Sequence, residues 1–296
     1  MKVRPFVKWA GGKTQLIGQI NKYLPLELTD GKIERYIEPF VGGGAVLIDV
    51  LQKYDVKSAI AMDINADLIN SYLVIKNNVE ELIKELAIKE EKYKKLDNDK
   101  RKEYYYEIRT EYNSYELEDE VINIKRASEF IFLNKTCFNG LYRVNKNNKF
   151  NVPFNNAKNP LIWDAENLRN LSKLTQNVNF ICGDYQKINN FVDNKTFIYF
   201  DPPYRPLTGT SDFTSYTKDS FNDDDQRNLG RFYKEQSLKG AKVMLSNSNP
   251  KNVSLEDKFF DEIYDGFNLN EVMAHRNINS KGDGRKLISE LLITNY

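Results

Sequence analysis

The segment Asp201-Pro202-Pro203-Tyr204 follows an apolar run, Thr196–Phe200, that has the composition of a buried strand. An acid, two prolines and an aromatic residue at the carboxyl end of such a strand place rigid acceptors and a stacking ring in the ligand crevice of an α/β sheet. The Asp201 carboxylate and the Pro202 carbonyl can accept the two hydrogens of a planar amino group, and Tyr204 can stack on the ring that carries it. This pattern indicates chemistry on an aromatic amine, whose delocalised lone pair must be localised before it can act as a nucleophile. The alternative is a turn that merely ends the strand.

Three consecutive glycines, Gly42 to Gly44, stand where a second predicted strand gives way to a helix. Glycines let the backbone turn tightly and approach a ligand at the helix N-terminus. Their spacing is not the G-x-G-x-x-G dinucleotide pattern. Asp63, at the end of the next predicted strand, is placed to accept hydrogen bonds from ribose hydroxyls. A glycine turn followed by this acid favours an adenosine-containing ligand over a purely structural turn and a helix-capping aspartate.

A second glycine motif, Gly11-Gly12-Lys13-Thr14, invites comparison with a P-loop. The P-loop pattern requires a glycine where Val7 stands, and Trp9 occupies the interior of the loop. The sequence therefore argues against nucleoside triphosphate hydrolysis. The same residues, with Lys8, could instead form a second wall around a ligand.

A basic, aromatic and Asn-rich stretch spans residues 134–158 and contains no acidic residue. The whole chain is nearly neutral, with 43 Lys and Arg against 42 Asp and Glu, so this charge is local. Residues 142–145 and 150–153 could pair as a hairpin around a turn at 146–149. Such a hairpin suits phosphate neutralisation and contact with base edges, and an exposed basic loop is the alternative. The basic residues are Lys135, Arg143, Lys146, Lys149 and Lys158.

Strand and helix patterns indicate an α/β fold. Apolar, β-branched runs predict strands at 35–39, 57–63, 178–182, 196–201, 241–246 and 287–295. Helical spacing at 45–53 and 67–77, with Asn65 as a cap, gives the alternating order of a parallel sheet. Charged helical periodicity then dominates between Val79 and Asn156. We therefore expect a catalytic domain of residues 1–70 and 160–296, with a mostly helical insertion at 71–159 that bears the hairpin.

Composition narrows the function classes further. The chain has 296 residues, of which 41% are hydrophobic, and this is typical of a folded globular protein. Two cysteines and one histidine exclude a disulfide scaffold, a Cys/His zinc site and most His-dependent triads, although a carboxylate metal site would survive this filter. No apolar run reaches about 18 residues, and the N-terminus lacks the apolar core of a signal peptide. We expect a reducing, cytoplasmic setting and no membrane association.

Together these motifs resemble the Dam-type DNA adenine methyltransferases, in type and in order, over essentially the whole chain. The resemblance rests on residues 5–13 (PFVKWAGGK), 38–44 (EPFVGGG), 138–143 (FNGLYR), 150–154 (FNVPF) and 201–204 (DPPY). Residues 213–216 and 245–247 also look like landmarks of this family.

The resemblance implies a Rossmann-like, S-adenosylmethionine-dependent enzyme that methylates the exocyclic amine of adenine within GATC in double-stranded DNA. Residues 201–204 would be catalytic, and no metal is implied. The residues that match cofactor contacts are Trp9, Ala10, Gly11, Lys13, Glu38, Pro39, Phe40, Gly42, Gly43, Asp63, Ile64, Asp184 and Asp201. Those that match DNA contacts are Lys8, Phe138, Asn139, Leu141, Arg143, Asn151, Pro153, Ser215 and Tyr216.

Phe138 stands where some relatives carry a tyrosine that wedges into the base stack, so the apolar ring is kept and a hydroxyl contact is lost. We expect the adenine to be flipped out of the duplex and methylated without a covalent enzyme intermediate. We also expect a monomer, with a cognate restriction endonuclease as a candidate partner. Two classes of rival function remain at this stage. One is an amino methyltransferase acting on cytosine, RNA or a protein amide, and the other is a DNA-binding regulator without turnover or a P-loop nucleotide hydrolase that uses Lys13.

Overall fold

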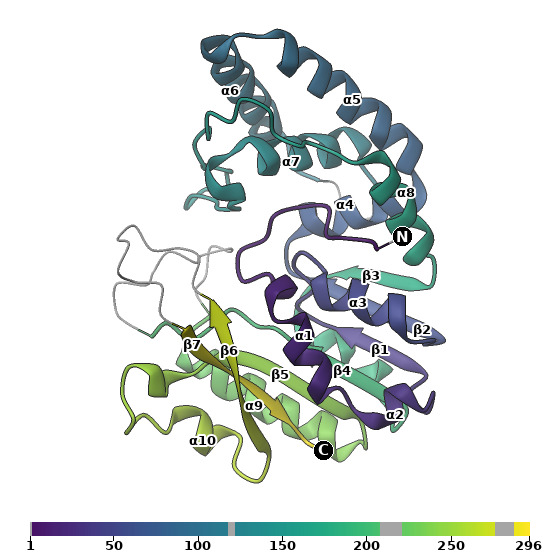
Figure 1. Ribbon diagram of the computed structural model, residues 1–296, viewed down its shortest axis with the longest axis vertical. Helices are drawn as coiled ribbons and strands as arrows, with labels where there is room; N and C mark the ends of the chain where they lie inside the picture. The colour runs from purple at the N-terminus through teal and green to yellow at the C-terminus, as the bar shows by residue number, and fades with distance from the viewer. Residues whose placement is uncertain (1, 118–121, 208–220, 276–286) are drawn as a thin grey trace.

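The computed structural model describes residues 2–117, 122–207, 221–275 and 287–296. Its centre is a seven-stranded sheet in the order β3-β2-β1-β4-β5-β7-β6, in which β7 alone runs antiparallel to its neighbours (Figure 1). The strands are β1 (Arg35–Glu38), β2 (Ser58–Asp63), β3 (Val178–Cys182), β4 (Thr196–Phe200), β5 (Lys242–Ser248), β6 (Asn268–His275) and β7 (Leu287–Thr294). The predicted α/β fold class is confirmed.

The sequence predicted every one of these strands except β6. Within the part of the chain that the structure describes, this strand lies at the edge of the sheet and pairs only with β7. Its sequence, NLNEVMAH, has polar residues at most of its first positions, and Met273 is 45% exposed. An edge strand needs to bury little of its surface, so it lacks the apolar run by which the buried strands were found.

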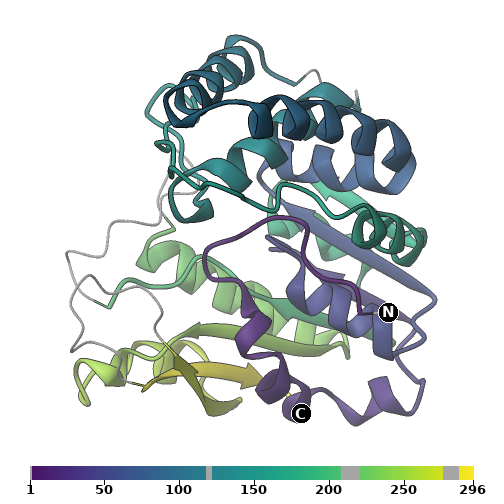
Figure 2. The ribbon, with the colours of Figure 1, turned by 45° about the horizontal axis from the view of Figure 1, so that its top comes forward.

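Both faces of the sheet are covered, as a mainly parallel sheet requires. Alternate residues of one strand enter different cores: Tyr36 packs with α3 and α4, whereas Ile37 packs with α9 and α10. Figure 2 shows helices above and below the sheet. The helices are α1 (Ile17–Ile20), α2 (Leu26–Thr29), α3 (Ala45–Lys53), α4 (Ala66–Asn77), α5 (Val79–Lys95), α6 (Asn98–Ser114), α7 (Ile124–Thr136), α8 (Ala165–Leu174), α9 (Asp223–Leu238) and α10 (Phe259–Ile263).

The two predicted helices after β1 and β2 are confirmed as α3 and α4. Asn65 caps α4 as expected, because its side chain accepts a hydrogen bond from the Leu68 backbone N–H at 3.0 Å. The helical character of the region after Val79 is also confirmed: α5, α6 and α7 pack together over α4 (Figure 1). The domain limits at residues 70 and 160 stay a prediction.

The predicted hairpin is present only as a tight antiparallel loop and not as two regular strands. Val144 and Phe150 form an isolated bridge, and the Asn145 N–H donates to the Lys149 carbonyl at 2.9 Å. Asn148 adopts a positive φ of 56° in the turn between them. The loop packs on the helices instead of on a partner strand, since Phe150 is buried against Tyr112 of α6.

An ion pair joins the helical region to the sheet-bearing part. Arg126 of α7 binds Asp67 of α4 at 2.6 Å, and its guanidinium lies 3.7 Å from the centroid of the Tyr112 ring. Arg126 and Tyr112 are buried, so this contact fixes α6 and α7 against α4. Among the described residues, no helix combines the length and the apolar character that crossing a membrane would require.

Gly44 precedes α3 with a φ of 70°, and a Cβ there would lie 2.4 Å from the Tyr72 hydroxyl. We therefore expect Gly44→Ala to lower the free energy of unfolding by roughly 1–3 kcal/mol, because both the backbone conformation and the space oppose a side chain. Thermal unfolding measures this. Tyr72→Phe removes the hydroxyl that this Cβ would meet. In a Tyr72→Phe background, Gly44→Ala should therefore lower the free energy of unfolding by less than it does in the parent protein. Gly18→Ala is the matched control, since no atom lies within 4 Å of a Cβ there; equal stability of Gly44→Ala and this control would contradict the expectation.

Candidate active site

The strand order reverses between β1 and β4, which lie side by side at the centre of the sheet. In open α/β sheets, ligands bind in the crevice outside the carboxyl ends of the strands at such a reversal. Glu38 ends β1, Asp63 ends β2, and Asp201 follows β4. The topology therefore brings the three segments that the sequence singled out to one edge of the sheet.

Asp201 is bound by Lys13 from the N-terminal loop. Lys13 Nζ lies 2.8 Å from Asp201 Oδ1, donates to the Gly11 carbonyl at 2.6 Å, and sits 4.5 Å from the centroid of the Tyr204 ring. The Lys13 side chain is 4% exposed and that of Asp201 is 19% exposed. Burial raises the pKa of Asp201 to about 6, although the adjacent Lys13 ammonium lowers it. The second glycine motif thus forms a wall of this site, as the sequence suggested.

A buried amide relay holds the turn after β4. Gln226 Nε2 donates to the Pro203 carbonyl at 2.9 Å, and Asn247 Nδ2 donates to Gln226 Oε1 at 3.0 Å. Asn247 Oδ1 in turn accepts the Arg205 backbone N–H at 3.2 Å. Gln226 and Asn247 are fully buried, and each unmade bond there would leave a buried polar group without a partner. The relay therefore fixes the backbone on both sides of Tyr204. Sequence reasoning identified Asn247 only as part of a family landmark and missed Gln226.

Glu290 of β7 was also missed. Its Oε2 accepts a hydrogen bond from the Tyr204 hydroxyl at 2.7 Å. The available signal was an acidic residue inside the apolar strand LISELLIT. Only the fold shows that this acid reaches Tyr204, because the two residues are 86 positions apart.

The glycine turn after β1 is held from three sides. The Gly42 N–H donates to Asp63 Oδ2 at 3.0 Å, and the Gly42 carbonyl accepts from the Tyr72 hydroxyl at 3.0 Å. A Cβ on Gly42 would lie 2.8 Å from Trp9 Cδ1, so glycine here also makes room for the indole. Asp63 Oδ1 accepts the Asn65 N–H at 2.9 Å. Asp63 therefore orders the turn, and burial raises its pKa.

The remaining predicted cofactor residues surround this turn. Glu38 is 2% exposed and accepts the Tyr36 hydroxyl at 2.9 Å; burial raises its pKa well above the ordinary value. Ile64 is 61% exposed beside Asp63 and offers an apolar surface at the strand end. Phe40 packs on Tyr185, and Pro39 is buried. The Asp184 side chain caps the turn after β3 by accepting the Gln186 N–H at 2.9 Å.

One buried amide, that of Asn134, joins Lys8 to the turn at Gly140, beside the predicted DNA contacts Asn139 and Leu141. Asn134 Oδ1 accepts the Lys8 N–H at 2.9 Å, while Asn134 Nδ2 donates to the carbonyls of Lys8 and Gly140 at 2.8 and 3.0 Å. A Cβ on Gly140 would collide with the Lys8 side chain, so these segments are in direct contact. The Phe138 N–H donates to the Pro153 carbonyl at 2.8 Å, which joins the second half of the loop.

The side chains on this loop are accessible. Phe138 is 52% exposed, and Asn139 is exposed with a φ of 55°. Arg143 Nε donates to Asn151 Oδ1 at 2.7 Å, which orients the guanidinium. Leu141 is half-buried. Ser215 and Tyr216 lie outside the described residues.

The basic loop, residues 134–158, also contacts the N-terminal loop that carries Trp9. The rings of Trp9 and Tyr142 stack with centroids 5.7 Å apart and planes at 22°. Trp9 therefore lies between the glycine turn and the basic loop.

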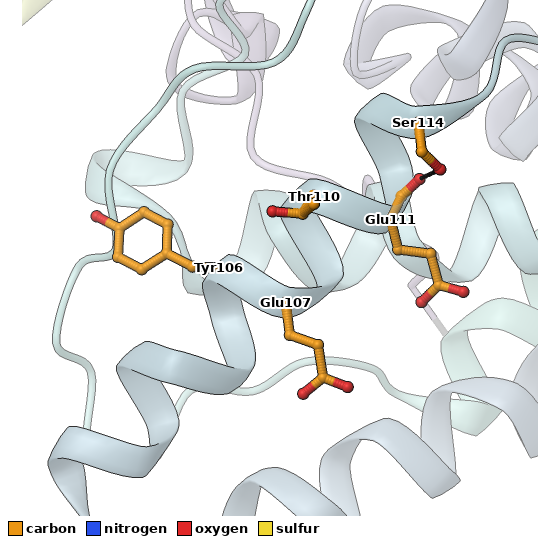
Figure 3. Close-up of a pocket in the computed structure, with 5 residues that line it drawn as sticks. All are labelled: Tyr106, Glu107, Thr110, Glu111 and Ser114. Atoms are coloured by element: carbon orange, nitrogen blue, oxygen red, sulfur yellow. Dashed lines mark hydrogen bonds between the residues drawn. The ribbon is translucent and has the colours of Figure 1, made fainter.

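Elsewhere, a hollow along α6 is lined by Tyr106, Glu107, Thr110, Glu111 and Ser114 (Figure 3) and includes none of the predicted site residues. Within the described ranges, no group of three His, Cys, Asp or Glu side chains is arranged to hold a metal ion.

The family model for D12 class N6 adenine-specific DNA methyltransferases matches residues 9–278. The chain belongs to this family. Three curated relatives align with nearly the whole chain. The type II methyltransferase M.MjaIII of Methanocaldococcus jannaschii is 54% identical and covers 100% of both chains. The type II methyltransferase M1.LlaDCHI of Lactococcus lactis subsp. cremoris is 36% identical over 100% of this chain and 96% of its own. The DNA adenine methylase of Haemophilus influenzae is 35% identical over 99% of this chain and 93% of its own.

Family membership confirms the predicted activity: this protein is an adenine-specific DNA methyltransferase. It sets aside the alternatives of a nucleotide hydrolase, of a regulator without turnover, and of an enzyme for cytosine, RNA or protein amides. Membership also implies S-adenosylmethionine as the methyl donor and DNA as the substrate.

Proposed function

We propose that this methyltransferase acts on adenine flipped out of double-stranded DNA within the sequence GATC. The observation that carries the proposal is the position of Asp201 and Tyr204 at the reversal of the sheet, next to the glycine turn and within reach of Lys13. An acceptor and an aromatic ring at a ligand crevice fit a planar amine. The same edge of the molecule carries the basic loop, so DNA bound there would present its bases to this crevice.

Residues of this chain fit S-adenosylmethionine on chemical grounds. Ile64 offers an exposed apolar surface for a purine ring, and the carboxylates of Asp63 and Asp184 stand at neighbouring strand ends for polar contacts. Lys13 and Trp9 would close the site from the N-terminal loop. When bound, S-adenosylmethionine supplies a methyl group on a positively charged sulfur. The full set of proposed cofactor contacts is Trp9, Ala10, Gly11, Lys13, Glu38, Pro39, Phe40, Gly42, Gly43, Asp63, Ile64, Asp184 and Asp201.

Asp201, Pro202 and Tyr204 would receive the flipped adenine. Flipping costs a few kcal/mol, and stacking on Tyr204 offsets part of this. Phe138, exposed at the tip of its turn, would fill the space that the base vacates. Asp201 accepts one hydrogen of the amino group and the Pro202 carbonyl accepts the other, which localises the nitrogen lone pair. The amine nitrogen then takes the methyl group directly, without a covalent enzyme intermediate. The carbon–sulfur bond breaks, which leaves S-adenosylhomocysteine as a neutral thioether, and the nitrogen gives up one proton toward Asp201 and solvent.

Sequence recognition would rest on Arg143, with Lys8, Asn139, Leu141, Asn151 and Pro153 beside it. The bond from Arg143 to Asn151 presents a planar donor pair that suits the edge of a guanine. Lys146 and Lys149 lie in the turn and suit phosphate contacts. Because two relatives carry the name of type II methyltransferases, we also propose a restriction endonuclease of the same specificity as a partner. We further propose that the methyltransferase acts in the cytoplasm and as a monomer.

The first test is single-base methylation profiling of plasmid DNA from a methylation-deficient host that expresses this chain. We expect N6-methyladenine confined to GATC. Asp201→Ala and the isosteric Asp201→Asn should abolish it while the protein stays folded, because either change removes the carboxylate. Methylation at another site would reject GATC, and full methylation by both variants would reject the role of Asp201.

The pH dependence of turnover tests the electrostatics of the site. Because the pKa of Asp201 is about 6, we expect kcat/KM to fall as pH drops through about 6, where the carboxylate becomes protonated. Lys13 lowers that pKa, so Lys13→Met should move this acidic limb to higher pH in addition to weakening cofactor binding. A limb that stays in place in Lys13→Met, or an ordinary aspartate value near 4, would contradict the assignment.

Arg143→Ala should relax discrimination at one base pair of the site. A bidentate arginine–guanine contact contributes about 1–3 kcal/mol, so we expect kcat/KM for GATC to fall about 5- to 150-fold relative to a site altered at that pair. The matched control is Lys146→Ala, which should weaken binding to all sequences alike and flatten its salt dependence. Equal losses on every sequence for Arg143→Ala would make Arg143 a phosphate contact instead.

A further inference from the structure

We propose that Glu290 is a positioning residue for methyl transfer, which holds the Tyr204 ring in its stacking orientation through the tyrosine hydroxyl. This inference rests on the proposed role of Tyr204 as the surface on which the flipped adenine stacks. It assigns a function to β7, the last strand along the chain, which lies outside all the sequence motifs of the site.

The geometry shows how Tyr204 is restrained. The relay through Gln226 fixes the backbone at Pro203, which leaves the two side-chain torsions of Tyr204 to orient the ring. The hydroxyl at the far end of the ring donates to Glu290 Oε2 at 2.7 Å. The ring is thus held at both ends, while the Lys13 ammonium lies 4.5 Å from its centroid.

Glu290 is itself on a rigid support. It is a residue of β7, where it pairs with Ser248 of β5 on one side and Val272 of β6 on the other. A strand that is paired on both sides is a rigid support for its side chains, so the carboxylate is a fixed point in the crevice. A hydrogen bond from a tyrosine hydroxyl to a carboxylate is charge-assisted and stronger than one between neutral groups.

A fixed ring matters because reaction rates depend steeply on orientation. A displacement of about 1 Å of the reacting groups can cost on the order of 100-fold in rate. If Tyr204 rotated away, an adenine stacked on it would move relative to Asp201. The contribution of Glu290 should therefore fall mainly on kcat and only weakly on the KM for DNA, because the phosphate and base-edge contacts remain.

Glu290 also belongs to the charged surroundings of Asp201. Among the described residues, the groups that face Asp201 are Lys13 of the N-terminal loop, Tyr36 and Glu38 of β1, Tyr199 of β4 and Glu290 of β7, together with Tyr204. The negative charge of Glu290 raises the pKa of Asp201, and Lys13 opposes it. Removal of that charge should therefore move the acidic limb of activity to lower pH.

The experiment compares Glu290→Ala, Glu290→Gln, Tyr204→Phe and the double variant Tyr204→Phe/Glu290→Ala on a GATC duplex. Loss of a hydrogen bond to a charged group predicts that Glu290→Ala and Tyr204→Phe each lower kcat about 10- to 100-fold. Because both remove the same bond, the double variant should be no slower than the worse single variant. Glu290→Gln keeps a carbonyl acceptor, so its kcat above the acidic limb should stay within about threefold of the parent, with the limb shifted to lower pH. Glu271→Ala, on the neighbouring strand β6, is the control and should match the parent.

Thermal unfolding of each variant separates a folding defect from a positioning effect. Multiplicative losses in the double variant would overturn the inference, as would a Glu290→Gln enzyme as slow as Glu290→Ala, or parent-like rates for Tyr204→Phe. Tyr204→Ala separates this failure from failure of the proposed function. An inactive Tyr204→Ala with parent-like Glu290→Ala rejects only the role of Glu290, whereas an active Tyr204→Ala rejects the stacking role itself.

Discussion

The reversal of strand order between β1 and β4 is the constraint on which the rest of this structure depends. Because the two strands lie side by side and the chain leaves them in opposite directions across the sheet, their carboxyl ends open into one crevice. The glycine turn after β1 and the Asp201 turn after β4 therefore face each other. Lys13 then closes the crevice by its 2.8 Å bond to Asp201.

The buried polar groups around this crevice are organised by amides and carboxylates that accept or donate at more than one atom. Asn247 engages Gln226 and the Arg205 backbone, and Asp63 engages two backbone N–H groups. Asn134 plays the same part under the basic loop. Each of these side chains ties together segments that are distant in sequence. Unpaired, they would each destabilise the fold, so the same bonds that stabilise it also position the site.

The two halves of the enzyme meet along a continuous set of contacts. Arg126 binds Asp67 and fixes α6 and α7 to α4, while Trp9 stacks on Tyr142 of the basic loop. The loop that would read DNA and the turn that would bind the cofactor thus share Trp9 as a common neighbour. Their relative placement is set by aromatic packing and one buried ion pair.

The sequence by itself determined the features that depend on local pattern. Buried strands have apolar β-branched runs, and Asp201–Tyr204 had to stand at the end of one of them. The order of motifs also indicated an adenine methyltransferase. Tertiary structure alone decided what depends on side chains meeting across the fold. β6 lacks a pattern because an edge strand buries little. Residues 142–153 form a single isolated bridge instead of two strands, because Phe150 packs on Tyr112 of α6. The partners of Gln226 and Glu290 could be found only in the fold, because residue spacing does not predict a hydrogen bond between side chains as distant in sequence as Tyr204 and Glu290, which are 86 positions apart.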